Sequence, residues 1–437
     1  MIGTTARVRG LLGRRVLLAI FASVIVGGLT LPGHDSSPTA FAAAPTSHPS
    51  PSDSYRSQAD EKKWSESPIG VVPNRFGELF TIAGNLPDKY TLVFRNARRE
   101  IRVIEVNGNT LPDSLILLTR VPETRPSERS DANASGKRRP RKEKDASDGW
   151  EEKVAGVIPE RFGRLVEVSG VRGTYSLVFV NDEQEIRVIP FQGNEVKKIA
   201  SLFRQTPLGA KSEDSPKARD EVDADDGWTD MIQSNLPEHF GSIVTASSAS
   251  SKTRLVFENA LGDLTITNIQ PNKNSKIAYE VLRFVPSPSE RAGRDAEFKE
   301  RKKQGFRWKI QRGSVLPDSY GQVLRIDGVE TSNLVLRDYE GQLRLVHWNG
   351  KRLSTRASLI ERPVQTKKRE FTDEEKWDLN PIGAIPEEFG ELRGYLGDPE
   401  SPHKALLVFQ DENGELRLIF RNGGALPNKL KKITREY

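Results

Sequence analysis

The chain has 437 residues, of which 36% are hydrophobic and 29% are charged, and it contains no cysteine. The formal net charge of +6, from 66 basic and 60 acidic residues, is weak evidence for a nucleic-acid partner. The lack of cysteine excludes disulfide scaffolds, thiolate metal sites and cysteine nucleophiles. The length would hold two or three average domains, or more if they are small.

Residues 1–42 have the pattern of a signal peptide. Arg14 and Arg15 precede an uncharged apolar run at 16–31, and Ala40 and Ala42 form an Ala-x-Ala site. The run is shorter than the roughly 20 residues that span a bilayer, which favours cleavage after Ala42 over an uncleaved anchor that would place the protein at a membrane. We therefore expect export to an extracellular, cell-surface or periplasmic location. Residues 43–62 follow as a predicted disordered tether.

The rest of the chain contains one unit five times. Each copy has a tryptophan nine residues before a proline, and an aromatic residue followed by glycine comes three residues after that proline. The tryptophans are Trp64, Trp150, Trp228, Trp308 and Trp377, and the aromatics are Phe76, Phe162, Phe240, Tyr320 and Phe389. Agreement at fixed spacings indicates a tandem array. The copies occupy 63–121, 149–205, 227–285, 306–363 and 376–437.

The segments between the copies are rich in charge, serine and proline. They cover 122–148, 206–226, 286–305 and 364–375. Such stretches bury too little apolar surface to offset the entropy of ordering, so they are predicted to be disordered linkers. Because solenoid repeats abut directly, the linkers predict five independent domains of about 60 residues each.

Each copy is expected to be mainly β. In the second copy two β-prone runs flank a polar turn at Asn181, which predicts a β-hairpin. The Pro-x-x-aromatic-Gly motif predicts one helical turn, and the last stretch of each copy is either a short helix or a final strand. The predicted fold class is therefore five tandem small antiparallel β-domains, each a twisted sheet or partly closed barrel. The alternative is a sheet with one short helix packed on it.

Two sets of basic residues are candidate ligand contacts. A strand arginine recurs in four copies, with Thr265 as the exception in the third: Arg102, Arg187, Arg344 and Arg417. If these side chains point away from the core, they suit phosphate or carboxylate; the alternative is a cross-strand ion pair on a solvated face. The second set is a linker cluster that could bind anionic polymers or serve only solubility: Lys137, Arg138, Arg139, Arg141 and Lys142.

The recurring tryptophans and aromatics could form a sugar- or peptide-binding face, because large rings supply contact area at low entropic cost. The interpretation that we favour is a structural core, since small domains depend on a few large buried rings.

The sequence favours a binding protein over an enzyme. It has no zinc-protease, serine-hydrolase or phosphate-loop motif, and it predicts no metal site and no cofactor. We expect multivalent binding at the cell envelope through tandem modules. The partner would be an anionic envelope polymer or a surface protein, without specific nucleic-acid recognition. The alternatives are an assembly scaffold that contacts protein partners and, less favoured, a hydrolase of wall or matrix polymer.

Overall fold

The local structure of each copy follows the predicted motifs. The residues after each repeat proline form a single 3-10 turn, as in Asn74–Phe76 and Glu160–Phe162. The glycine that ends the turn has a φ of 83° at Gly77 and 78° at Gly163. A Cβ there would lie 2.2 Å and 2.0 Å from a carbonyl oxygen of the neighbouring strand. Only glycine can occupy this position, which explains why it recurs.

The predicted hairpin also forms. Asn181 begins the turn, and its Oδ1 accepts the backbone N–H of Glu185 at 2.8 Å, so the side chain replaces a backbone partner within the turn. Asn96 makes the same bond with Glu100 at 3.0 Å. The last stretch of each copy, for which the sequence left helix or strand open, is a strand.

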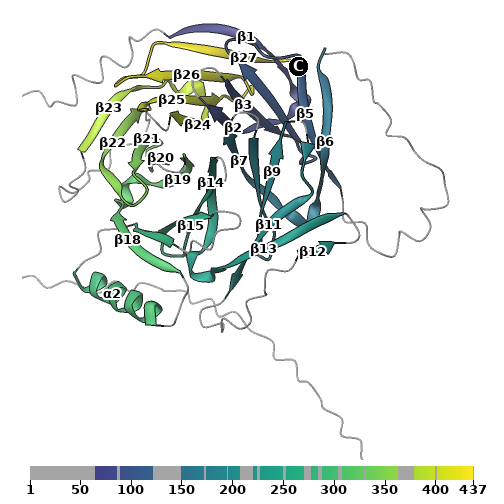
Figure 1. Cartoon of the computed structure of the whole chain (residues 1–437). Coiled ribbons are helices and arrows are strands. Elements are labelled where there is room, and N and C mark those ends of the chain that lie inside the picture. Colours follow the sequence, from purple (N-terminus) through teal and green to yellow (C-terminus); the bar gives the residue numbers. More distant parts are fainter. Residues whose placement is uncertain are drawn as a thin grey trace, which may run out of the picture. The chain divides into compact units, whose positions relative to one another are not determined.

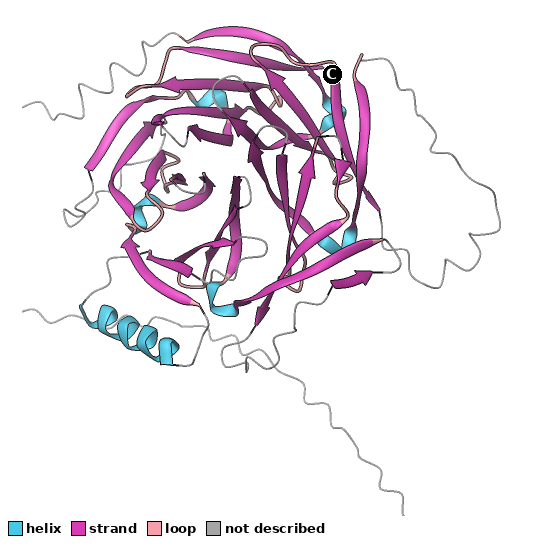
Figure 2. Ribbon diagram, viewed as in Figure 1, coloured by secondary structure: helices cyan, strands magenta, loops and turns pink. Residues whose placement is uncertain are grey.

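The strands form five sheets (Figures 1 and 2). Sheet 1 contains β2 (Glu78–Asn85), β3 (Lys89–Arg95), β4 (Ile101–Asn107), β5 (Ser114–Val121) and β6 (Glu151–Pro159). Sheet 2 contains β7 (Arg164–Val171), β8 (Thr174–Val180), β9 (Ile186–Gln192), β11 (Ile199–Thr206) and β13 (Trp228–Pro237), with the short β10 (Glu195–Val196) and β12 (Asp220–Asp223). Sheet 3 contains β14 (Ser242–Ala249), β15 (Lys252–Glu258), β16 (Leu264–Ile269), β17 (Ile277–Leu282) and β18 (Lys309–Val315). Sheet 4 contains β19 (Gln322–Asp327), β20 (Ser332–Arg337), β21 (Leu343–Trp348), β22 (Leu353–Glu361) and β23 (Asp378–Ala384). Sheet 5 contains β24 (Glu391–Asp398), β25 (Ser401–Gln410), β26 (Leu416–Asn422), β27 (Lys429–Glu436) and, from the start of the chain, β1 (Ser65–Pro73).

The first strand of every copy belongs to the sheet of another copy. Four consecutive strands pair antiparallel, and the first strand of the next copy then adds in parallel at the outer edge, as β6 does on β5. The N-terminal strand β1 adds in the same way to β27, with Glu66 opposite Leu430 and Val72 opposite Arg435. The two ends of the described chain therefore meet in one sheet.

This strand exchange accounts for the charged segments between copies. A parallel pair needs a crossover of a dozen residues or more to return the chain to the starting edge. Two of the charged segments stand in the sequence between strands that pair in this way, β5 with β6 and β22 with β23. The prediction of five independent domains on linkers is wrong, because the first strand of each copy completes the sheet of another copy. A long charged segment is needed for such parallel pairing as well as for a flexible tether, so its composition did not reveal the exchange.

Two of the predicted linkers also contain regular structure. The 206–226 segment includes β12, which pairs antiparallel with β13. The 286–305 segment includes the helix α2 (Pro288–Lys303), which is held to sheet 3 by an ion pair of 2.9 Å between Arg294 and Asp263.

The five sheets are arranged like the blades of a propeller. Their innermost strands contact one another in the cyclic order β2, β7, β14, β19, β24 and back to β2 (Figure 1). The large apolar clusters lie between neighbouring sheets. One of them combines Val103 of sheet 1 with Phe179 of sheet 2, and another combines Leu92 of sheet 1 with Leu418 of sheet 5.

The repeat aromatics pack between copies. Each of the four described repeat tryptophans meets the aromatic residue of the preceding copy edge to face, a geometry that adds to the energy of burial. The ring centroids are 5.3 Å apart for Trp150 and Phe76, 5.0 Å for Trp228 and Phe162, 5.6 Å for Trp308 and Phe240, and 5.2 Å for Trp64 and Phe389. The Trp64 contact repeats the pattern between the first and last copies. The structure thus places the repeat aromatics, Trp228 and Trp308 in the core, whereas Trp64 and Trp150 are half-buried against it. Trp377 lies outside the described residues.

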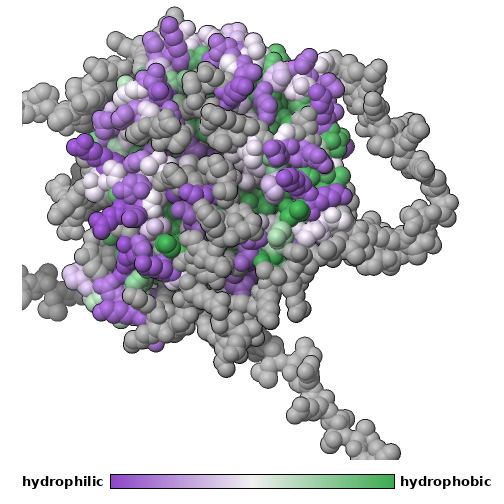
Figure 3. Space-filling model, in the orientation of Figure 1, coloured by the Kyte–Doolittle hydropathy of each residue, from purple (hydrophilic) through white to green (hydrophobic). Residues whose placement is uncertain are grey.

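The computed structural model describes residues 64–85, 89–121, 149–171, 174–193, 195–206, 220–223, 227–249, 252–269, 277–283, 288–303, 308–328, 331–362, 378–398 and 401–436. All of them belong to the compact unit Ser54–Tyr437. The predicted signal peptide, the tether, the 122–148 segment and the 364–375 segment lie outside this description. On the face seen in Figure 3, hydrophilic side chains cover much of the described surface, with smaller apolar areas between them.

Candidate functional site

The strand arginines are buried structural residues. Arg102, Arg187, Arg344 and Arg417 are only 5%, 5%, 4% and 8% exposed. Each guanidinium lies 4.5–5.5 Å from the ring centroid of the repeat aromatic in its own copy, which is a cation–π geometry. The expectation that these side chains point away from the core is therefore wrong, and so is the solvated face assumed in the alternative.

Three of these arginines have a carboxylate partner in the next copy, in addition to acids of their own copy. Arg102 bonds Glu152 at 3.2 Å, Arg187 bonds Asp230 at 3.0 Å, and Arg417 bonds Glu66 at 3.0 Å. Each acid lies two residues after a repeat tryptophan, on the strand that joins the neighbouring sheet. The arginine therefore fastens one copy to the next.

The junction between the third and fourth copies lacks both members of this ion pair. Thr265 replaces the strand arginine, and the acid of the fourth copy is replaced by Ile310. Both partners are lost together, which fits a structural pair. Arg344 instead bonds Asp338 of its own copy at 2.9 Å. The linker cluster from Lys137 to Lys142 lies outside the described residues, so its predicted role stays a prediction.

The repeated residues build the scaffold, so positions at which the copies differ are the candidates for a ligand site. One of these positions lies eight residues after each repeat proline, next to a bulge in the innermost strand. The five residues there are Thr81, Glu167, Thr245, Arg325 and Gly394. Arg325 of sheet 4 donates to Glu167 of sheet 2 at 2.5 Å, and Thr81 of sheet 1 donates to the same carboxylate at 2.6 Å.

This ion pair joins sheets that are not neighbours in the ring, so it spans the centre. Glu167 and Arg325 are 5% and 9% exposed. Burial raises the pKa of Glu167, while Arg325 and the Thr81 hydroxyl act against that shift. The pair closes the middle of the ring rather than presenting groups to a ligand.

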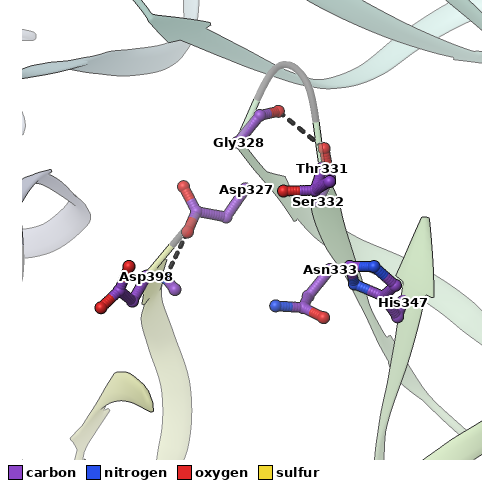
Figure 4. Close-up of a pocket in the computed structure, with 8 residues that line it drawn as sticks. Asp327, Gly328, Thr331, Ser332, Asn333, His347 and Asp398 are labelled. Atoms are coloured by element: carbon purple, nitrogen blue, oxygen red, sulfur yellow. Dashed lines mark hydrogen bonds between the residues drawn. The ribbon is translucent and has the colours of Figure 1, made fainter. Parts of the chain in front are cut away.

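A small polar pocket lies between sheets 4 and 5 (Figure 4). Asp327 faces Gly397, whose N–H it accepts, and Asp398 lies beside them. Asn333 and His347 lie across the pocket from these carboxylates. The pocket has room for about one water molecule, with a volume near 10 Å³. It is too small for an organic ligand.

The Asp327 carboxyl should make stability depend on pH. Burial raises its pKa to about 6, against hydrogen bonds from Gly397 and Gly328 and the charge of Arg325. The unfolded chain ionises this group first, near pH 4, so stability falls as pH rises from about 4 to 6 and stays lower above. We expect Asp327→Asn to raise the free energy of unfolding at pH 8 by about 1–3 kcal/mol and to change little at pH 4.

Urea unfolding at both pH values measures this effect. The matched control is Glu412→Gln, at an exposed hairpin carboxylate, and it should leave stability unchanged at both. An equal effect of Asp327→Asn at pH 4 and pH 8 would mean that the ionisation of Asp327 is not its cause.

A larger groove lies where sheet 5 meets sheet 1. Its volume is about 690 Å³, within the range of small-molecule sites. The apolar part of its lining is Pro68, Ile69, Phe420, Pro427 and Leu430, and the cationic part is Lys404, Arg421, Lys429 and Lys431. None of the described residues that line it carries a carboxylate. The groove therefore presents positive charge beside an apolar wall.

Arg421 is the unusual member of this lining. It is 3% exposed, and its Nε donates to the carbonyl oxygen of Gly423 at 3.0 Å. No described carboxylate forms an ion pair with it. Burial lowers its pKa, and the nearby Tyr395 only partly offsets that effect. A buried guanidinium without an anion is costly, so the groove holds a cation that lacks its counter-charge.

The other cations of the groove come from β25 and β27. Lys431 reaches across the junction to the carbonyl oxygen of Gly108 at 3.4 Å and to Asn109 Oδ1, and its Nζ lies 4.3 Å from the ring centroid of Phe420. Lys404 lies 4.0 Å from Asp398. Lys429 is exposed at the rim.

The groove is specific to this junction. By strand register, the position of Arg421 is occupied in the other copies by Val106, Phe191, Ile269 and Trp348, and that of Lys431 by Ile116, Ser201, Tyr279 and Ser358. The repeated residues do not reveal this site, because it is formed by residues that differ between copies. The signal in the sequence was Arg421 and Lys431, which are basic at positions where the other copies have no cation.

The described ranges hold no group of three or more His, Asp and Glu side chains that could bind a metal ion. In the same ranges, no helix has both the length and the apolar character needed to cross a bilayer.

No family model matches the chain, and no curated protein sequence matches it. Solved structures of lectins are similar at low identity. The fungal Aleuria aurantia lectin, described as a six-bladed β-propeller, matches with 9% identity, a TM-score of 0.30, and 79% of this chain and 92% of its own covered. AofleA from Arthrobotrys oligospora matches with 8% identity, a TM-score of 0.34 and coverage of 84% and 96%. The BP39L lectin of Burkholderia pseudomallei matches with 10% identity, a TM-score of 0.28 and coverage of 80% and 99%.

Proposed function

We propose that this protein is a non-catalytic binding protein whose groove between sheets 5 and 1 holds an anionic ligand. The observation that carries the proposal is Arg421, a buried guanidinium that lines the groove without a described carboxylate partner. A bound phosphate, sulfate or carboxylate would supply the missing charge, and guanidinium binds such groups through paired hydrogen bonds.

The five copies then do not act as five separate binding modules, which is the role that the sequence predicted. They form one scaffold, and the ligand site arises once, where the first and last copies meet. We propose that export, which the 1–42 segment predicts, brings this groove to an anionic component of the cell envelope.

The Arg421→Gln variant should bind anions at least about tenfold more weakly than the native chain, because a hydrogen bond to a charged group contributes about 1.5–3 kcal/mol. The measurement is calorimetric titration with glucose 6-phosphate and with glucose at low salt. Glucose should bind more weakly than its phosphate, and the phosphate affinity should fall as salt rises.

The matched control is Arg356→Gln, which removes the cation at the position of Lys429 in the fourth copy, outside the groove. Its affinity should equal that of the native chain. The native chain, but not Arg421→Gln, should also sediment with isolated cell envelopes. Equal binding by both arginine variants would contradict the assignment of the site.

A further inference from the structure

We infer that the ligand of the groove is an amphipathic anion, with a phosphate or carboxylate joined directly to an apolar chain or ring. This inference rests on the proposed function and narrows it. A purely hydrophilic polyanion would use the cations but would leave the apolar side of the same groove in water.

The apolar wall is continuous with the core of the junction. Ile69 and Phe420 pack against the apolar cluster shared by sheets 5 and 1. Phe420 also meets Tyr90 of sheet 1 edge to face, with ring centroids 5.8 Å apart, and Leu430 is 4% exposed. These contacts fix the wall in place, so an apolar ligand group would meet a preformed surface.

Among the described strand positions, an aromatic residue and these cations occur together only in the last copy. By strand register, the position of Phe420 is occupied in the other copies by Glu105, Pro190, Asn268 and His347. In the last copy the Phe420 ring lies beside a cation of the groove, with Lys431 Nζ 4.3 Å from the ring centroid. A ligand that uses both residues must carry an apolar group within a few bonds of its anionic group.

The size of the groove agrees with this class of ligand. A volume of about 690 Å³ exceeds what a phosphate or carboxylate group alone would fill. Covering the wall with methylene groups would remove apolar surface from water on both partners, which favours binding in proportion to the area buried. The tail should therefore contribute to affinity independently of the head.

The experiment compares probes that differ in one part only. Octyl phosphate, used below its micelle concentration, is titrated beside ethyl phosphate, which has the same head, and octyl glucoside, which has the same tail. We expect octyl phosphate to bind at least tenfold more tightly than either. Ile69→Ser, which changes the wall, should reduce the advantage of octyl over ethyl phosphate while leaving ethyl phosphate binding unchanged. The thermal midpoint of Ile69→Ser must equal that of the native chain. If Ile69→Ser is less stable, Pro68→Ser, at an exposed position of the wall, replaces it in the experiment.

The outcomes separate this inference from the proposed function. Equal affinity for octyl and ethyl phosphate, with both lost in Arg421→Gln, would overturn the amphipathic ligand and leave the anion site intact. Absence of binding by every phosphate at low salt would overturn both. Equal binding of octyl phosphate to the native chain and to Arg421→Gln would show non-specific detergent binding and would overturn the inference. An octanoate arm distinguishes a carboxylate head from a phosphate head.

Discussion

A chain that begins at residue 74, and therefore lacks β1, is expected to be less stable than the native chain by about 4–6 kcal/mol. The deletion removes the parallel partner of β27, the Trp64 ring that packs on Phe389, and the burial of Val72, which is 0% exposed. Burying one aliphatic or aromatic side chain contributes about 1.5–3 kcal/mol. Arg417 also loses Glu66, one of its carboxylate partners. Thermal and urea unfolding measure the loss.

The control deletion begins at residue 63 and keeps β1. It should have the stability of the native chain, since all of the contacts just named remain. The two deletions should also differ in ligand binding, because Pro68 and Ile69 of β1 line the groove. Equal stability of the two deletions would contradict closure of the ring by β1.

By the same reasoning, residues 149–206 alone should not fold cooperatively, because their outer strand β13 lies in the next copy.

Arg325→Leu is expected to cost about 3–5 kcal/mol at pH 7, because it leaves the Glu167 carboxylate buried and unpaired at the centre of the ring. The double variant Glu167→Leu with Arg325→Leu should recover most of that loss, since an apolar pair carries no desolvation penalty. A double-mutant cycle from urea unfolding measures the coupling.

The pH dependence gives a second test of the central pair. Burial already raises the pKa of Glu167, and removing Arg325 takes away the main opposing charge. The folded protein then holds this proton more tightly than the unfolded chain, so the deficit of Arg325→Leu should shrink as pH falls. The double variant should not show this change. If Arg325→Leu and Glu167→Leu each lowered the free energy of unfolding by less than about 1 kcal/mol, water would have to reach the ion pair.

Local structure followed from the sequence by itself. The Asx residue of each hairpin and the alternation in the strands depend on contacts within a few residues, and the glycine after each repeat aromatic depends on a strand of its own copy. The 3-10 turn at Asn74–Phe76 and the hairpin at Asn181 therefore form as predicted. The count of five copies and the placement of the repeat aromatics in a core were also readable, because every copy needs the same buried rings.

The partners of these residues were decided only by the tertiary structure. Trp150 packs on Phe76 and Arg102 bonds Glu152, although each pair spans two copies. A charged segment between repeats is compatible with a flexible tether and with a crossover, and composition does not separate the two. The joint loss of the arginine at Thr265 and of the acid at Ile310 was the one signal of contact between copies.

The candidate site depends most strongly on the tertiary structure. Ile69 and Arg421 line one groove although some 350 residues separate them, and they meet only because β1 pairs with β27. Sequence patterns report spacing within a copy, whereas the groove is formed by the closure of the ring. The repeats thus determined the scaffold, and ring closure determined where an unpaired buried cation lies beside an apolar wall.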